Sequence, residues 1–451
     1  MKRSGLTART APVKTPIPFP RAAAQLLVLG ACLLALGACE KDSCTDRWTQ
    51  EVWAPVTLDR ETVHDSIALL PARELCVGSG LYAYGDYLFA NLPREGYHLL
   101  DNRDPANPTP VAFLRVPGAT HMAFVDGRLV SDSYADLLVL DFDGQRLELL
   151  SHHPNFLLHD NQLGPDDPGE TVIGYELREM EFEQSCDGGL TGRWGGCAFC
   201  DVRTLEATSF DVGRGGGLGS PSVNTSGSLS RIAFAGQHVY VLGETQLATY
   251  RLDGGELVNT NNQQPGWGLE TATVRAGFLY LGSMTGMHIY DLADPAVPRF
   301  RSRYQHFTAC DPVAVEGDRA VVTLRSGTRC GGAAENVAIV LDISDRDNPR
   351  ELQTLAMNNP RGVALHQGSL YVCDGPNGLR VYDFDDGAIG LRAREGQGDD
   401  SRETTDVAVL PYPTGTVVLT IGPDHLTQYR REGVAEVSRL SRLQADRCAG
   451  L

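Results

Sequence analysis

The chain has 451 residues, of which 42% are hydrophobic and 21% charged, so a sizeable core is possible and global disorder is excluded. The formal net charge is −18, and an acidic surface of this kind repels phosphate backbones, which argues against nucleic acid as a partner. Glycine occurs 49 times and proline 25 times, a composition typical of a protein built mainly of strands and turns.

Residues 1–38 have the pattern of an export signal. Basic residues without acidic ones precede the apolar stretch AAAQLLVLGACLLALGAC at 22–39, which is too short to count as a membrane-spanning helix. LGAC occurs twice, ending at Cys32 and Cys39, and the apolar run stops at the second copy. The ending resembles the lipobox of bacterial lipoproteins. This resemblance implies that Cys39 carries lipid, including palmitate, and anchors the mature chain to a membrane. The alternatives are an uncleaved anchor and an ordinary signal peptide.

The predicted destination is the bacterial cell envelope, outside the cytoplasm, with the outer membrane or its periplasmic face favoured. The segment 39–78 follows the lipid cysteine and contains Trp48 and Trp53. We expect it to pack against the rest of the chain or to supply a closing strand.

Residues 79–443 repeat one unit. GFLYLGSMTGMHIYDLADPAVP at 277–298 and GSLYVCDGPNGLRVYDFD at 368–385 each contain a strand, a turn and a second strand. Apolar and polar residues alternate, which predicts antiparallel strands, while glycine suits the turns and the proline of Asp-Pro ends a strand. The recurring first-turn glycines are Gly85, Gly127, Gly236, Gly277, Gly317 and Gly368.

A unit of about 40 residues with four short strands has the size of one β-propeller blade. We therefore predict an all-β fold: a single propeller of seven four-stranded blades, with a long insert at 152–228 between blades two and three and a tail at 444–451. Blades three and seven lack the Asp-Pro corner, so their outer strands are the least defined by the sequence.

These units resemble the LVIVD repeat of β-propeller lipoproteins in the bacterial cell envelope. The residues that carry the resemblance are GFLYLGSMTGMHIYDLADPAVP, VAIVLDISDRDNP and GSLYVCDGPNGLRVYDFD. It extends over most of residues 80–440 and implies a fold rather than a chemistry.

Cysteines outside the cytoplasm are expected to form disulfides. In the insert, we predict disulfide bonding among Cys186, Cys197 and Cys200, because a zinc site there lacks a fourth ligand. Cys310 and Cys330 bracket a predicted hairpin and are predicted to pair.

One further cysteine is expected to behave differently. Cys373 lies within the apolar strand LYVC and is predicted to be a buried thiol.

Ionisable residues recur where each predicted innermost strand begins, which is the channel mouth of a propeller. The candidate ligand-binding residues are His121, Arg231, Glu270, Asp311, Arg361 and Asp406. Converging charges can recognise a ligand. Alternatively, Glu270 with Arg231 and Asp311 with Arg361 neutralise each other and fill the channel, and the frequency of structural ion-pair networks favours this interpretation.

No catalytic set, metal site or cofactor motif is predicted. The spacing of His152, His153, His159 and Asp160 fits no known ligand pattern, so solvated loop side chains are the preferred interpretation.

The predicted function is a lipid-anchored, non-catalytic binding or scaffold protein for a protein, peptide or glycan partner. The alternative is a metal-assisted, lactonase-like hydrolase in which His121, Glu270, Asp311 and Asp406 surround a cation. Arg231 and Arg361 would repel that cation and would suit an anionic ligand instead.

Overall fold

The structure is a computed structural model that describes residues 45–76, 78, 80–157, 164–185, 224–226, 230–306, 312–326, 335–383, 390–394, 402–412, 415–433 and 436–446. Several predictions concern residues outside these ranges and are not tested by it: the signal peptide with Cys39, the pair Cys310 and Cys330, the insert cysteines Cys186, Cys197 and Cys200, and Asp311.

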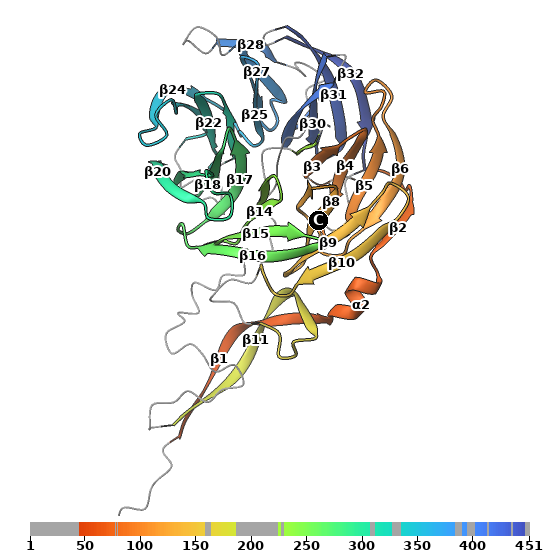
Figure 1. The fold of residues 1–451 in the computed structure, drawn as a ribbon, viewed down its shortest axis with the longest axis vertical. Helices are drawn as coiled ribbons and strands as arrows, with labels where there is room; N and C mark the ends of the chain where they lie inside the picture. Colours follow the sequence, from red (N-terminus) through yellow and green to blue (C-terminus); the bar gives the residue numbers. More distant parts are fainter. Residues whose placement is uncertain are drawn as a thin grey trace, which may run out of the picture. The chain divides into compact units, whose positions relative to one another are not determined.

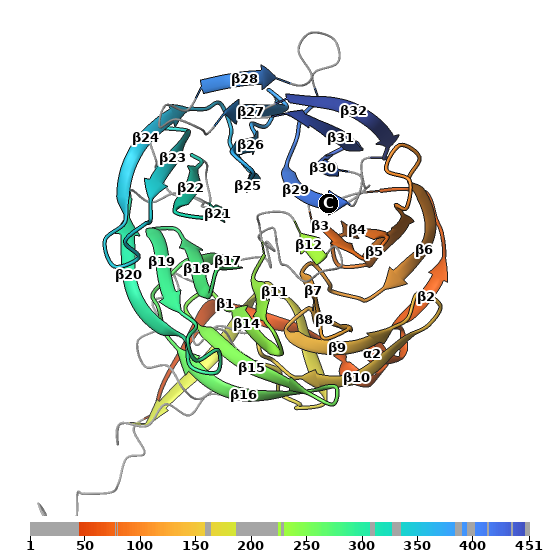
Figure 2. The ribbon, with the colours of Figure 1, turned by 45° about the horizontal axis from the view of Figure 1, so that its top comes forward.

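The described chain is almost entirely β-structure, arranged as seven antiparallel blades around a common centre (Figures 1 and 2). The strands of blades one to three are β3 (Leu81–Tyr84), β4 (Tyr87–Leu92), β5 (Gly96–Asp101) and β6 (Thr109–Arg115); β7 (Met122–Val125), β8 (Arg128–Ser133), β9 (Asp136–Phe142) and β10 (Leu147–His153); β13 (Ile232–Ala235), β14 (His238–Leu242), β15 (Leu247–Asp253) and β16 (Glu256–Gln263).

The remaining four blades follow without interruption by other elements. Their strands are β17 (Leu269–Arg275), β18 (Phe278–Ser283), β19 (Gly286–Asp291) and β20 (Arg299–Gln305); β21 (Val313–Glu316), β22 (Arg319–Leu324), β23 (Val337–Asp342) and β24 (Arg350–Ala356); β25 (Val363–His366), β26 (Ser369–Cys373), β27 (Leu379–Asp383) and β28 (Gly390–Arg394); β29 (Asp406–Tyr412), β30 (Gly415–Gly422), β31 (His425–Gly433) and β32 (Glu436–Gln444). The prediction of seven four-stranded blades is confirmed.

The first strand of each blade lies innermost, and each inner strand contacts the inner strand of the next blade, with β29 returning to β3. Cores form between neighbouring blades. In β22, Val322 packs toward blade four whereas Val321 packs toward blade six. Successive side chains of a strand point to opposite faces. A strand in the middle of a blade has a neighbouring blade on each side and is therefore apolar on both faces.

The repeat glycines occupy the turn after each inner strand. Their φ angles lie between 55° and 79°, in the left-handed region, at Gly85, Gly127, Gly236, Gly277, Gly317 and Gly368. The outer strands of blades three and seven form despite the missing Asp-Pro corner. In blade three, Gly254 and Gly255 make the turn with φ angles of 61° and 102°.

Four elements lie outside the regular blades. β2 (Ala68–Pro71) pairs with β6 and adds an outer strand to blade one, while β12 (Asn224–Ser226) pairs with β3 on its inner side. β1 (Thr45–Asp59) and β11 (Glu170–Ser185) form a separate two-stranded sheet. The single described helix, α2 (Arg60–Asp65), begins where β1 ends, with Asp59 accepting from the Thr62 amide as its N-cap.

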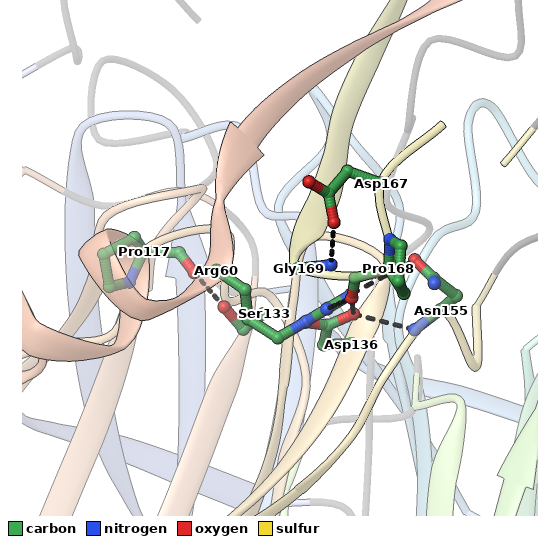
Figure 3. A network of polar contacts seen from close by, with 8 residues as sticks. All are labelled: Arg60, Pro117, Ser133, Asp136, Asn155, Asp167, Pro168 and Gly169. Atoms are coloured by element: carbon green, nitrogen blue, oxygen red, sulfur yellow. Dashed lines mark hydrogen bonds and ion pairs between the residues drawn. The ribbon is translucent and has the colours of Figure 1, made fainter. Parts of the chain in front are cut away.

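A buried ion pair fastens α2 to blade two (Figure 3). Arg60 Nε donates to Asp136 Oδ2 at 2.7 Å, and the two residues are only 6% and 1% exposed. The same guanidinium donates to the carbonyl oxygen of Pro168, just before β11. The backbone N–H of Asn155 donates to Asp136 Oδ1 at 2.7 Å. This clamp holds three segments that are distant in the sequence.

The ring closes between blades seven and one without exchanging a strand. Asn102 and Gln428, both buried, form two reciprocal amide hydrogen bonds of 3.0 and 2.7 Å across this seam. The Asp446 amide also donates to the Leu75 carbonyl at 2.9 Å. Beside it, Cys76 is disulfide-bonded and bridges to Asp446 in parallel. The ring is therefore closed by side-chain contacts between blades seven and one and by the pairing of residues 75 and 76 with Asp446.

Candidate functional site

The predicted mouth residues lie at one end of the inner strands, because every blade begins with its inner strand running in the same sense. We call this end of the propeller the mouth face. His121 and Arg231 directly precede β7 and β13, Glu270 is the second residue of β17, Arg361 lies two residues before β25, and Asp406 opens β29. Asp311 lies outside the described residues.

His121 is enclosed rather than presented to solvent. His121 is only 3% exposed, and neither nitrogen of its ring has a hydrogen-bond partner. Burial, and secondarily the charge of Arg231, lowers the pKa of His121 to about 3. The imidazole is therefore neutral at physiological pH.

Asp132 is a site residue that the sequence analysis missed. It lies on β8, opposite the start of β7, and is 3% exposed. Its Oδ1 accepts from the amides of Thr120 and His121 at 2.7 and 2.8 Å, and its Oδ2 accepts from the Thr120 hydroxyl. Burial raises the pKa of Asp132 to about 6. The sequence feature that could have identified Asp132 is its position in the mainly apolar segment LVSDSYADLLVL, where a carboxylate is expected to be buried.

Arg231 lies among carboxylates. Burial lowers the pKa of its guanidinium, while Glu270, Glu244 and Asp132 act in the opposite direction by favouring the charged form. Glu244 belongs to the β14–β15 turn, and its carbonyl accepts from the Leu269 amide at 2.8 Å, which brings blades three and four together here. The positive charge of Arg231 is thus compensated within the protein.

Arg361 has a direct ion-pair partner, Glu403, which the sequence analysis also missed. Nη2 of Arg361 lies 2.9 Å from Glu403 Oε1, and the Arg361 amide donates to the Cys373 carbonyl at 2.8 Å. Cys373 is buried and free, as predicted, and burial raises the pKa of its thiol.

Asp406 is buried where blades six and seven approach closely. A Cβ atom at Gly362 would lie 2.5 Å from Asp406 Oδ1 and 2.6 Å from its Cα. Oδ1 accepts from the Val407 amide at 2.9 Å. Only glycine at position 362 permits this approach, so Gly362 allows blades six and seven to come together at the mouth.

Strand β12 lies inside the ring of inner strands (Figure 2). Its Ser226 pairs with Tyr82 and its Asn224 with Tyr84 on β3. Tyr82 in turn donates to the Thr120 carbonyl at 3.0 Å, beside Asp132. A piece of the long insert therefore covers the channel wall at blade one.

Within the described ranges, no three His, Cys, Asp or Glu side chains are grouped so that they could hold a metal ion. The His152 ring contacts His64 at 4.7 Å and the His153 ring contacts Tyr250 at 5.2 Å, whereas His159 and Asp160 fall outside those ranges. No helix in the described part of the chain is both long and apolar enough to cross a membrane.

Comparison with known proteins gives no family model and no curated protein that matches. Among solved structures, a putative 6-phosphogluconolactonase from Bacteroides uniformis has 12% identity and a TM-score of 0.49, over 83% of this chain and 97% of that one. The periplasmic gluconolactonase of Pseudomonas aeruginosa has 12% identity and a TM-score of 0.47, over 84% and 97%. BamB from Moraxella catarrhalis has 11% identity and a TM-score of 0.39, over 83% and 95%.

Proposed function

We propose that this protein is a non-catalytic binding protein that recognises a protein, peptide or glycan partner through its mouth face. The observation that carries the proposal is the internal compensation of the mouth charges. Arg361 pairs with Glu403 at 2.9 Å, and Arg231 lies among Glu270, Glu244 and Asp132. Charges compensated within the protein are not available to bind a charged ligand, which leaves recognition to the surface around them.

The proposed location is the bacterial cell envelope, with Cys39 as the lipid anchor of an LVIVD-type propeller. The lipobox-like LGAC ending at Cys39 supports the anchor. The disulfide at Cys76 supports an oxidising compartment, because such bonds rarely persist in the cytosol.

The lactonase-like alternative requires a cation at the mouth, and the described residues do not favour one. Arg231 and Arg361 bring positive charge to the site that the cation would share. The pKa of His121, lowered to about 3, makes this imidazole a weak base at neutral pH.

The first test is metal analysis of the chain from residue 40, with thermal melts in EDTA and in Ca²⁺. We expect no stoichiometric metal and unchanged melting temperatures. A stoichiometric metal that is lost in His121→Ala, together with a lower melting temperature in EDTA, would replace the binding proposal with the hydrolase.

The second test is site-specific photo-crosslinking in cells. Glu95 lies in the exposed β4–β5 turn of the mouth face, whereas Gln237 lies in the exposed β13–β14 turn at the opposite end. A crosslinking residue at Glu95 is expected to capture an envelope component that the same residue at Gln237 does not. Equal capture at both positions, or none at either, would contradict binding through the mouth face.

A further inference from the structure

An exposed tryptophan stands on the mouth face between blades three and four. Trp267 is 55% exposed, the largest exposed fraction of any large hydrophobic residue in the described part of the chain. It lies in the loop that leads from the outer strand β16 to the inner strand β17. Tryptophan supplies a large apolar contact surface with one polar N–H, which suits it to the recognition of a partner.

The backbone fixes the position of this loop. Gly266 and Gly268 have φ angles of 146° and 70°, and a Cβ atom at Gly268 would lie 2.8 Å from Met284 Cγ. The Gly268 carbonyl accepts from the Met284 amide at 2.8 Å, and the adjacent Leu269 amide donates to Glu244. The backbone that carries Trp267 is therefore held in place, which lowers the entropy lost when a ligand binds.

The segment that leads from β16 to Trp267 is uncharged and rich in amides. The segment LVNTNNQQPGWGL, 257–269, contains no ionisable residue although 21% of the chain is charged. Asn259 and Asn262, both exposed, exchange hydrogen bonds of 3.0 and 3.2 Å, and Gln246 donates to Asn262 at 3.4 Å.

Asn262 lies at the mouth end of β16, Gln246 lies in the β14–β15 turn at the same end, and Asn259 lies in the middle of β16. Gln263 pairs with Leu247, which pairs with Leu242, the last residue of β14. Asn262 precedes Gln263, so it approaches the mouth face close in sequence to Trp267. An amide carries both donors and acceptors, and Asn262 keeps an N–H beyond the bond it makes to Asn259.

We propose that Trp267 and the amides of Asn259, Asn262 and Gln246 form a binding surface for a neutral glycan. The apolar C–H face of a pyranose ring stacks on an indole, and its hydroxyl groups both donate and accept as amides do. The absence of charge in 257–269 disfavours an ionic protein contact, and the net charge of −18 disfavours an acidic glycan. This inference rests on the proposed function and names one partner class for it.

The test is calorimetric titration of the chain from residue 40 with cellohexaose, chitohexaose, maltohexaose and, as the acidic comparison, a hexagalacturonate. We expect one neutral hexasaccharide to bind and the hexagalacturonate not to bind. Trp267→Ala is expected to weaken binding at least about tenfold, as removal of a central aromatic contact does, whereas Trp267→Phe retains most of it. Asn262→Ala is expected to weaken binding less.

Phe300→Ala is the matched control, because Phe300 is 54% exposed but lies on the outer strand β20. It should bind as the unaltered chain does, and Trp267→Ala should melt at an unchanged temperature. No binding of any neutral hexasaccharide below about 1 mM, or equal binding by Trp267→Ala, would overturn the glycan proposal. If crosslinking from Glu95 persists in that case, the glycan surface fails while the binding function stands; if both fail, the proposed function fails too.

Discussion

Replacing Asp136 with asparagine should destabilise the protein by roughly 3 kcal/mol, because it leaves the guanidinium of Arg60 buried without a counter-charge. The two residues are 6% and 1% exposed and form N–H···O contacts of 2.7 and 3.4 Å. Breaking a buried pair by removing one partner costs about 3–5 kcal/mol. The lower end applies here, since Arg60 keeps the Pro168 carbonyl and lies 3.5 Å from Asn155 Oδ1.

The measurement is urea unfolding of the chain from residue 40, with Asp136→Asn compared with Glu95→Gln. Glu95 pairs with Arg73 at a similar 2.7 Å, but these side chains are 56% and 40% exposed. Water screens that pair, so Glu95→Gln should change the free energy of unfolding by less than about 1 kcal/mol. The double variant Arg60→Met with Asp136→Leu should be more stable than Asp136→Asn, because it removes both buried charges.

Equal effects of Asp136→Asn and Glu95→Gln would refute this reasoning, since burial would then not govern the energy of the clamp. A double variant less stable than Asp136→Asn would show that the geometry of the hydrogen bonds, rather than the uncompensated charge, supplies the stability.

Three further predictions concern stability and reactivity. Asn102→Ala, which leaves the buried Gln428 amide without its reciprocal partner, should cost about 1–3 kcal/mol in urea unfolding, and an unchanged midpoint would show that the seam does not depend on this pair. Cys373, buried with a raised thiol pKa, should react with a thiol reagent at neutral pH only after denaturation, and rapid reaction of the native chain would contradict its burial. The pKa of His121 is lowered to about 3 in the folded state from the usual 6.5, so the unfolded chain binds the extra proton and stability falls as pH decreases from about 6.5 toward 3. The slope is roughly 1.4 kcal/mol per pH unit for this residue, partly offset below about pH 6 because the pKa of Asp132 is raised to about 6; His121→Gln should flatten the profile, and an unaltered profile would refute the assignment.

The blade architecture was predictable because each blade is specified by a short sequence pattern that recurs along the chain. Gly277 and Gly368 mark the same turn in different blades, and both have left-handed backbone angles. Two-residue alternation then fixes which side chains face each neighbouring blade, as it does for Val321 and Val322. Information of this kind needs no knowledge of distant partners.

Apart from those of Asp132, which lie within one hairpin, the contacts missed from the sequence join segments that no local pattern connects. Arg60 lies at the start of a short helix and finds Asp136 76 residues later. Glu403 precedes β29 and pairs with Arg361 from the preceding blade. The pairing of β12 with β3 depends on the route of the long insert back to the ring, which has no repeat to reveal it.

The same distinction explains why the sequence located the mouth while it identified only some of the partners of the charged groups there. Position at the start of an inner strand follows from the repeat, but the state of each group follows from its neighbours. The sequence favoured neutralisation of Arg231 by Glu270 and of Arg361 by Asp311. In the structure Arg361 forms its ion pair with Glu403, and Glu244 and Asp132 act on Arg231 together with Glu270. Trp267, by contrast, belongs to no repeat phrase, and its loop is braced by Met284 from the next blade. In a radial array, features that depart from the repeat are free to differ between proteins of one fold, so recognition is better sought at Trp267 than among the compensated charges.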